Sequence, residues 1–532
     1  MDHPTRQSPL LTPWYANWLN PFIPEEFLSE CLWLPDRSRS MGIHLAAGRG
    51  SGKSRLMGRT IAWEDFLRGA PVVIFDPMGG TIDNFLSMII RLPQPIQECL
   101  WPYVWYVDAS GHSGHVIPMP LYYHLGNEGL YEVSQRFLDV VRKLDPHLQT
   151  ASIEGWNSLW KLGTTAGTIL AALGCQITEA EDLIQHPHDW IARARHVPPP
   201  VATEIAPAIH TLEAFALLKD DVRQRQSAAF LNKVALFMFD PTMRAMFGAS
   251  DGGINWQTSV DEGHAILFDF RGEADVERRR FKMVWAFQSL MSYIKYRGMG
   301  RHRPISVIID ELTALFSPAV LATDLFAADL DELINVVARN CMVWLTIAHQ
   351  ELFQLSKPAQ KTLLAMGTQI LGVTNDRDAA LVLARHFFPY DPHRVKKNTD
   401  YGTVEFTLQE QEYLNSNIFM GQGRFHFLAR VAAGEGDTRG TLEPITIEGL
   451  DAGCYPDSEL VAQAREQLMQ RSGKRVSEVL REVEARRTLI KQPSPHPKNV
   501  QPARSFATLE KDGAFNNSIF REKKAATDAQ AR

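Results

Sequence analysis

The residues best suited to chemistry lie in one short stretch, Met41 to Arg55, with the sequence MGIHLAAGRGSGKSR. A mostly apolar segment, 42–47, predicts a short buried strand, and a helical pattern continues from the end of the stretch to about Leu67. A strand, a glycine loop, Lys-Ser and a helix in this order are typical of the phosphate-binding loop of P-loop NTPases. We therefore expect ATP and Mg²⁺ to be bound by Gly48, Arg49, Gly50, Ser51, Gly52, Lys53, Ser54 and Arg55.

The types of these residues fit that chemistry. Glycines let the backbone curl so that successive N–H groups face a phosphate, and the N-terminus of the following helix adds positive potential. Lys53 would reach the β- and γ-phosphates, and the Ser54 hydroxyl would bind Mg²⁺. The usual pattern begins with a glycine where this chain has Ala47, which is a mild departure beside the extra glycines Gly48 and Gly50.

A second segment, Ile305 to Glu311 (ISVIIDE), supplies the acids that an ATPase needs. Its apolar run predicts a buried strand that ends in two carboxylates. Asp310 would hold Mg²⁺, and Glu311 would polarise the attacking water as general base. Many strands end in acids, so an ordinary acidic strand end is the alternative. The pairing with Lys53-Ser54 favours the catalytic interpretation.

A further strand is predicted from Met342 to Ala348 and is followed by Gln350. Because the carboxyl ends of parallel strands share one edge of a sheet, Gln350 can lie beside the γ-phosphate and report its presence. Arg339 closes the helix predicted before this strand. It could reach the nucleotide of a neighbouring subunit as an arginine finger. The alternative, that it is a surface arginine without a catalytic role, is equally consistent with the sequence.

Together with the strand Pro71 to Gly80 (PVVIFDPMGG), these segments resemble one group of proteins. The phosphate loop, the Asp-Pro-x-Gly turn, IIDE and the Arg339 to Gln350 pair are similar, in the same order, to the hexameric DNA-pumping ATPases of the HerA/FtsK superfamily. The resemblance is strongest to conjugative coupling proteins of the TraG/TraD type. It covers roughly residues 41–450, and it includes Met119-Pro120-Leu121 where the family has Asn-Pro-Leu after its third strand.

The resemblance implies a homohexameric ring that moves DNA without reading its sequence, with a relaxase or secretion-channel proteins as partners. It carries over the roles given above: Lys53 and Ser54 for phosphate and Mg²⁺, Asp310 and Glu311 for Mg²⁺ and water, Gln350 as sensor and Arg339 as trans finger. Two rival functions stay open, a type IV secretion ATPase acting on protein substrates and a nucleotide-sensing ATPase subunit of a defence complex.

Coupling proteins usually begin with membrane helices, and HerA proteins carry a β-barrel before the ATPase. Residues 1–40 contain no apolar run of spanning length and leave no room for a barrel. We therefore expect a cytoplasmic protein without direct membrane insertion. Five scattered cysteines fit a reducing compartment, and the net charge of −6 excludes a chain built as a polycation for nucleic acid.

The predicted fold class is α/β, a RecA-like P-loop NTPase core with a mostly parallel sheet, an all-α insertion and a disordered C-terminal tail. Apolar residues at helical spacing predict insertion helices over Leu130–Leu144, Ile153–Leu173 and Thr211–Phe239. The predicted organisation is a capping segment at 1–40, the ATPase domain at 41–125 and 251–450, the insertion at 126–250, one charged helix within 451–491, and the tail at 492–532.

Basic residues that could grip a phosphate backbone fall into three groups. One is Arg278-Arg279-Arg280 with Lys282, a second is the set around Lys295 to Arg303, and the third is the tail. Because Glu273, Asp275 and Glu277 precede the triple arginine, local ion pairs at a helix start are the favoured interpretation there.

Overall fold

The computed structural model describes residues 7–9, 33–145, 153–300, 302–315, 318–321, 323–350, 352–399, 402–431, 444–448 and 457–491. The predicted tail and most of the predicted capping segment lie outside these residues. Of the capping segment, strand β1 (Gln7–Pro9) pairs with β2 (Trp33–Pro35), and helix α2 (Asp36–Ser40) leads into the core.

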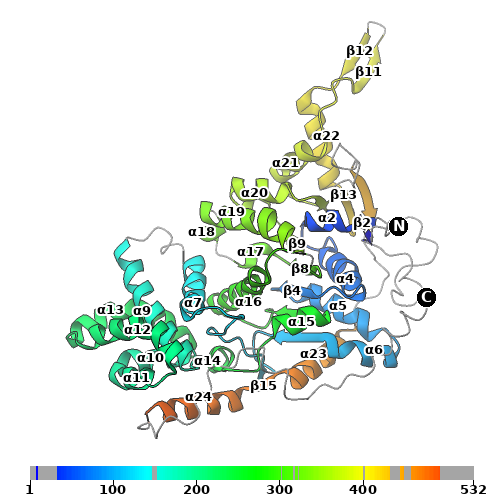
Figure 1. The fold of residues 1–532 in the computed structure, drawn as a ribbon. Helices are drawn as coiled ribbons and strands as arrows, with labels where there is room; N and C mark the ends of the chain where they lie inside the picture. Colours follow the sequence, from blue (N-terminus) through cyan, green and yellow to red (C-terminus); the bar gives the residue numbers. More distant parts are fainter. Residues whose placement is uncertain are drawn as a thin grey trace.

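A nine-stranded sheet forms the centre of the molecule, in the order β14-β13-β10-β3-β9-β8-β4-β7-β5 (Figure 1). The seven strands from β10 to β5 run parallel, and β13 and β14 add an antiparallel edge. This arrangement confirms the predicted mostly parallel sheet. The strands are β3 (Ile43–Ala46), β4 (Val72–Asp76), β5 (Val104–Asp108), β7 (Ala265–Asp269), β8 (Ile305–Ile309), β9 (Val343–His349), β10 (Thr368–Leu371), β13 (His426–Arg430) and β14 (Ile445–Glu448).

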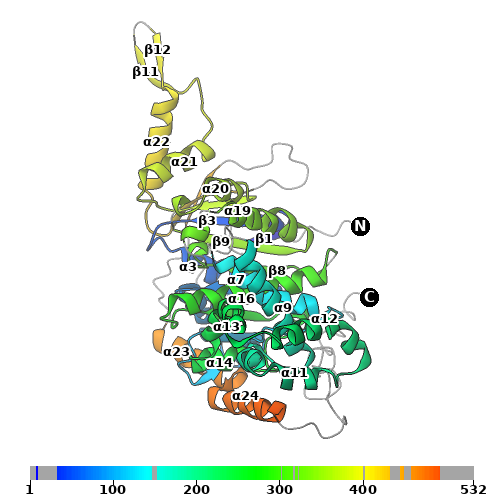
Figure 2. The ribbon, with the colours of Figure 1, turned by 90° about the vertical axis from the view of Figure 1, so that its left-hand side faces the viewer.

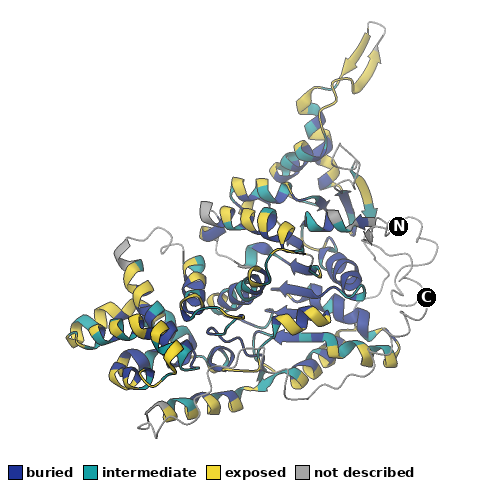
Figure 3. Cartoon of the chain, viewed as in Figure 1, coloured by how far each residue is buried: buried dark blue, intermediate teal, exposed yellow. Residues whose placement is uncertain are grey.

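The central strands are buried along their whole length, as Figure 3 shows by their dark colour. Helices cover both faces of such a parallel sheet, so its strands are runs of apolar and β-branched residues instead of alternating patterns. This is why segments such as VVIFD and ISVII predict strands so clearly. The helices packed around the sheet are α3 (Lys53–Arg55), η2 (Leu56–Ala62), α4 (Trp63–Leu67), α5 (Gly80–Ile90), α6 (Gln94–Leu100), α15 (Trp256–Glu262), α16 (Val276–Arg297), α17 (Leu312–Leu315), α18 (Pro318–Leu321), α19 (Asp324–Asp331), η6 (Glu332–Ala338) and α20 (Lys357–Leu364).

Four neighbouring strands place an aspartate at the same edge of the sheet. Asp76, Asp269 and Asp108 are the last residues of β4, β7 and β5 and lie side by side in register. Asp310 directly follows β8 on the other side of β4. The carboxyl edge of the sheet is therefore lined by acids, which is where ligands bind in parallel α/β folds.

The predicted insertion is all-helical and projects to one side of the sheet, as Figures 1 and 2 show. The helix predicted from Thr211 to Phe239 is interrupted, because residues 217–219 separate two helices and a 3-10 turn ends the second. The insertion consists of α7 (Leu130–Leu144), α9 (Ile153–Ala172), η4 (Ile177–Glu179), α10 (Ala180–Gln185), α11 (Pro187–Ala194), α12 (Pro199–Ala216), α13 (Asp220–Val234), η5 (Ala235–Phe237) and α14 (Pro241–Gly248).

A helix pair, α21 (Arg377–Phe387) and α22 (Leu408–Met420), carries a hairpin made of β11 (Val395–Thr399) and β12 (Gly402–Glu405). The hairpin extends away from the body and is exposed on both faces (Figures 1 and 3).

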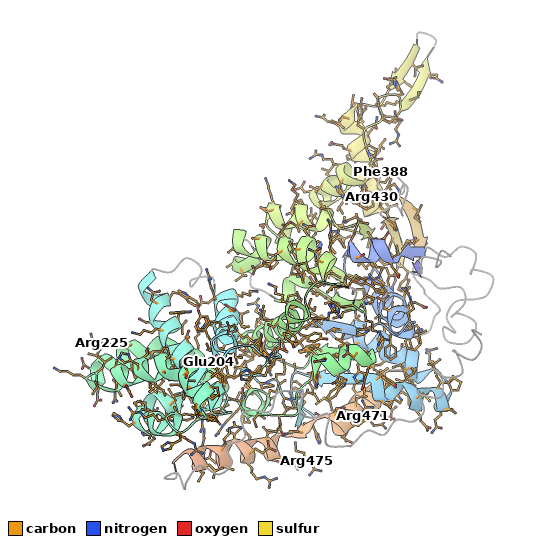
Figure 4. The ribbon with its side chains drawn as sticks, in the orientation of Figure 1. Glu204, Arg225, Phe388, Arg430, Arg471 and Arg475 are labelled. Atoms are coloured by element: carbon orange, nitrogen blue, oxygen red, sulfur yellow. The ribbon has the colours of Figure 1, made fainter. Side chains whose placement is uncertain are left out.

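The single helix predicted within 451–491 is wrong, because this segment contains two helices. Helix α23 (Ser458–Ser472) packs on β5 and α5, strand β15 (Lys474–Arg475) pairs with β6 (His115–Val116), and α24 (Val476–Lys491) packs on α14. The break comes at Gly473, where an added Cβ would lie 2.6 Å from the Met469 carbonyl oxygen. In Figure 4, Arg471 and Arg475 mark this segment, which ties the sheet to the insertion.

Among the described residues, no helix combines the length and the hydropathy that a membrane span requires.

Candidate active site

The loop between β3 and α3 has the backbone of a phosphate cradle. Gly50 and Gly52 have φ values of 80° and 98°, in the left-handed region that glycine adopts at little cost. Ala47, which replaces the first glycine of the motif, is not among the residues with positive φ, and its N–H donates to the His349 carbonyl. The position that departs from the pattern thus continues the strand and needs no glycine.

Several backbone N–H groups of the loop have no acceptor in the described part of the chain. Among the described residues, none accepts a hydrogen bond from the backbone N–H groups of Arg49, Gly50, Gly52, Lys53 and Ser54. The Ser51 hydroxyl is also buried without a partner in that part of the chain. Clustered, unsatisfied donors at the start of a helix form an anion site, so the loop fits the phosphates of a nucleotide.

The phosphate loop and the end of β8 meet directly. The Ser54 hydroxyl donates to Asp310 Oδ2 at 3.1 Å. Lys53 Nζ lies 3.5 Å from Asp310 Oδ1 and 3.4 Å from Glu311 Oε2. The Ser54 and Asp310 oxygens together are hard donors of the kind that Mg²⁺ prefers, so the residues present fit that ion.

Glu311 is held in a strained backbone conformation, with a φ of 65°. A non-glycine residue in the left-handed region costs of the order of 1 kcal/mol, and such strain persists where the surrounding structure enforces it. Here the enforcing neighbours are Asp310, whose N–H donates to the Phe75 carbonyl, and Leu312, which is buried. In this conformation Glu311 Oε2 lies 3.4 Å from Lys53 Nζ.

Asp76 organises the turn beside this pair of acids. Its Oδ1 accepts from the N–H groups of Met78 and Gly79, and its Oδ2 accepts from those of Thr81 and Ile82. The Thr81 hydroxyl then donates to Asp310 Oδ2 at 2.8 Å. Burial, with the nearby carboxylates of Asp310 and Asp269, raises the pKa of Asp76 to about 7.

Arg271 fastens the same turn to its neighbours. Its guanidinium donates to the Gly79 carbonyl and pairs with Asp83 on α5 and Asp269 on β7. Arg465 of α23 approaches the same carboxylates, 3.3 Å from Asp83 Oδ1. The acids at the edge of the sheet are thus partly neutralised on the side away from Lys53.

Comparison with known proteins identifies the fold. No family model and no curated protein matches the sequence. The structure is similar to the bacterial conjugative coupling protein TrwBdeltaN70 in its unbound monoclinic form, with a TM-score of 0.52 and 12% identity over 80% of this chain and 89% of that one. The plasmid coupling protein TrwB in complex with ADP and Mg²⁺ gives a TM-score of 0.51 and 12% identity over 87% of this chain and 98% of that one.

This chain has the fold of TrwB. The predicted resemblance to coupling proteins and the predicted RecA-like core are thereby confirmed as statements about architecture. VirB4 of Thermoanaerobacter pseudethanolicus is a more distant match, with a TM-score of 0.41 and 13% identity over 76% of this chain and 88% of that one.

Within the TrwB-like fold, the predicted site residues divide into two sets. Lys53 contacts Asp310 and Glu311, and Ser54 contacts Asp310. Gln350 follows β9 at the same edge, between β3 and β8, and is exposed. Arg339 is exposed before the start of β9, at the opposite edge of the sheet.

Several of the basic residues considered for DNA contact already bind carboxylates or carbonyls of this chain. Arg278 pairs with Asp240 and Glu273, and Lys282 is fully buried against Glu273. For Arg278 and Lys282 these pairs agree with the favoured interpretation of ion pairs at a helix start, whereas Arg279 and Arg280 make no ion pair among the described residues. In the second group, Lys295 pairs with Glu332, Arg297 donates to the carbonyls of Arg303 and Cys341, and Arg303 donates to the Asp261 carbonyl.

Three residues of the site were not predicted: Asp76, Thr81 and Phe425. The sequence around Asp76 could have indicated its role, because Asp76 ends an apolar run before Pro-Met-Gly-Gly, just as Asp310 follows another apolar run. The sequence around Thr81 and Phe425 contains no comparable pattern. Phe425 has a φ of 66° and lies against the phosphate loop from a segment about 370 residues further along the chain.

Proposed function

We propose that this protein is an ATP-hydrolysing DNA translocase, a coupling ATPase that pumps DNA through a homohexameric ring in conjugative transfer or in the mobility of a mobile element. The observation that carries the proposal is the contact of Lys53 and Ser54 with Asp310 and Glu311 at the carboxyl edge of a parallel sheet. The TrwB fold supports the choice of pathway, since TrwB is described as a conjugative coupling protein and has been seen with ADP and Mg²⁺.

The residues divide the work of hydrolysis. The open N–H groups of the loop hold the phosphates, and Lys53 turns from the two carboxylates toward the phosphate charge. Ser54 and Asp310 hold Mg²⁺, which supplies neutralisation of the developing charge on the phosphates. Glu311 orients the attacking water and accepts its proton, and Gln350 lies where it can sense the γ-phosphate.

Arg339 fits a role in trans. It precedes β9, while the phosphate loop lies beyond the other end of that strand, which is about 20 Å long at 3.3 Å per residue. An exposed arginine so far from the site of its own chain can serve the site of a neighbour, where it would stabilise the transition-state charge. The ring would then place each nucleotide between two subunits.

The test is ATP turnover by the purified full chain with single-stranded DNA, duplex DNA or no DNA, alongside the mass of the assembly. We expect DNA to stimulate turnover, and we expect Lys53→Ala and Glu311→Gln to abolish turnover while preserving the melting temperature. Normal hydrolysis by the Glu311→Gln protein would contradict the assignment of the site.

The same experiment separates the rival functions. Stimulation by a protein substrate and not by DNA would identify a type IV secretion ATPase acting on proteins. Assembly that depends on nucleotide, with no stimulation by either, would identify a nucleotide-sensing subunit of a defence complex.

A further inference from the structure

Phe425 is fixed against the phosphate loop by its backbone and by its ring. Its N–H donates to the Ser51 carbonyl at 2.8 Å, and its φ of 66° is strained for an aromatic residue. The ring covers Gly52 so closely that a Cβ added to Gly52 would lie 2.2 Å from ring atom Cδ1. A buried aromatic in a strained conformation is therefore held at a defined place on the loop.

Two arginines lie over this ring. The Cζ atoms of Arg55 and Arg424 are 4.8 Å and 4.7 Å from its centroid. Arg55 is buried, whereas Arg424 is exposed. No carboxylate of the described residues pairs with Arg424, so its guanidinium is positioned by the ring and has no salt bridge in that part of the chain. A planar cation seated on an aromatic ring leaves its other face available.

The contacts of Phe425 indicate which end of a nucleotide the 424–425 segment faces. In a phosphate loop, the backbone N–H groups cradle the α- and β-phosphates while the lysine reaches the β- and γ-phosphates. Phe425 packs on Gly52 and Arg55, whereas the Lys53 amino group contacts Asp310 and Glu311. Because the ribose and base extend from the α-phosphate, we place them on the side of the loop where Phe425 and Arg424 lie.

We propose that Arg424, seated on Phe425, is a stacking platform for the nucleobase of the bound nucleotide. The inference rests on the proposed nucleotide site and adds the chemical class of group that the 424–425 segment receives, an aromatic base recognised through its π-face. Guanidinium planes stack on bases without reading their hydrogen-bonding edges, so adenine and guanine nucleotides should both be accepted. Phe425 acts as a positioning residue for Arg424.

The test compares ligands with and without a base. The full-length protein with Mg²⁺ and a fluorescent N-methylanthraniloyl-ATP probe is titrated with ATP, GTP or inorganic tripolyphosphate as competitor. We expect Arg424→Ala to weaken ATP and GTP by about tenfold, within the range measured for base stacking, and to leave tripolyphosphate unchanged. Arg424→Trp should retain affinity for ATP because it preserves a stacking plane, and Arg424→Lys should not.

The control is Arg481→Ala, since Arg481 is an exposed arginine of α24 whose one hydrogen bond within the described residues goes to the Ser477 carbonyl of its own helix. The proposal is overturned if Arg424→Ala weakens ATP and tripolyphosphate equally, because Arg424 would then contact phosphate. It is overturned as well if the variant binds ATP normally, or if the wild-type protein binds ATP no better than tripolyphosphate. If the wild-type protein binds neither, the proposed nucleotide site itself fails.

Discussion

The Ser54 hydroxyl donates to Asp310 Oδ2 at 3.1 Å, although the two residues are 256 positions apart in the sequence. The contact exists because β3 and β8 are parallel strands of one sheet with only β9 between them, so both end at the same edge. The insertion lies between the two segments in sequence, yet it leaves this edge intact. The geometry of the site is therefore a property of the sheet, and it can be tested by perturbing the backbone around it.

Gly52 and Gly50 should respond differently to alanine. Both have positive φ, so either substitution strains the backbone by of the order of 1 kcal/mol. A Cβ at Gly52 also meets the Phe425 ring at 2.2 Å, whereas a Cβ at Gly50 meets nothing within 4 Å. We expect Gly52→Ala to lower the free energy of unfolding by about 1–3 kcal/mol more than Gly50→Ala does, as measured by urea denaturation. Equal losses would show that Phe425 does not pack on the loop as described.

Glu311 should tolerate glycine better than alanine. Its φ of 65° is costly for any side chain, and glycine relieves that cost. Both substitutions remove the carboxylate and should abolish hydrolysis. The Glu311→Gly protein should nevertheless be more stable than Glu311→Ala by about 1 kcal/mol in thermal unfolding. A more stable alanine variant would mean that the backbone at this strand end is relaxed.

His44 should make the fold sensitive to acid. Its Nδ1 faces Gln369 Oε1, and its Nε2 lies 2.7 Å from His349 Nε2. Gln369 uses its amide nitrogen to donate to the carbonyls of Leu363, Leu364 and Met366, so its oxygen must accept from a proton on His44 Nδ1. His44 Nε2 then accepts a hydrogen bond from His349. Protonation of His44 Nε2 would break that hydrogen bond, so the buried ring is neutral.

Burial lowers the pKa of His44 from 6.5 to about 4, although the hydrogen bond to Gln369 opposes the shift. Because the folded state resists protonation, the stability that neutral His44 contributes is present above pH 6.5 and is lost as the pH falls toward 4. The loss amounts to about 3 kcal/mol. The difference in unfolding free energy between the wild type and His44→Gln, a neutral donor and acceptor, should shift by about that amount between pH 7 and pH 4. A difference that does not change with pH would contradict the buried neutral histidine.

The C-terminal segment should be required for the stability of the insertion. Arg486 of α24 pairs with the fully buried Glu179 at 2.7 Å and donates to the Gly248 carbonyl. Removing one partner of a buried pair leaves an uncompensated charge, so Arg486→Met should cost about 3 kcal/mol in urea denaturation. The double variant with Glu179→Gln should recover part of the loss, and Arg481→Met on the exposed face of the same helix should cost little. Equal effects of the two arginine substitutions would show that α24 does not dock there.

The sequence predicts the elements of this fold well where the signal is local. Runs such as VVIFD and ISVII are apolar because their strands are buried on both faces, and their terminal acids indicate the functional edge. Features that depend on contacts between distant segments cannot be predicted from the local sequence. Strand β15, which follows Gly473, pairs with β6 about 360 residues earlier in the chain, and nothing in the charged helical pattern around it shows this pairing. Phe425 likewise acquires its role only when the antiparallel edge of the sheet brings it onto Gly52.

Lys53, Ser54, Asp310 and Glu311 should act as one site for a triphosphate and its metal ion. The direct measurement is calorimetric titration of the full chain with ATP, with and without Mg²⁺, for the wild type, Lys53→Ala and Asp310→Asn. We predict Mg²⁺-dependent binding by the wild type, none by Lys53→Ala, and binding that no longer depends on Mg²⁺ in Asp310→Asn. Wild-type affinity in both folded variants would contradict the account.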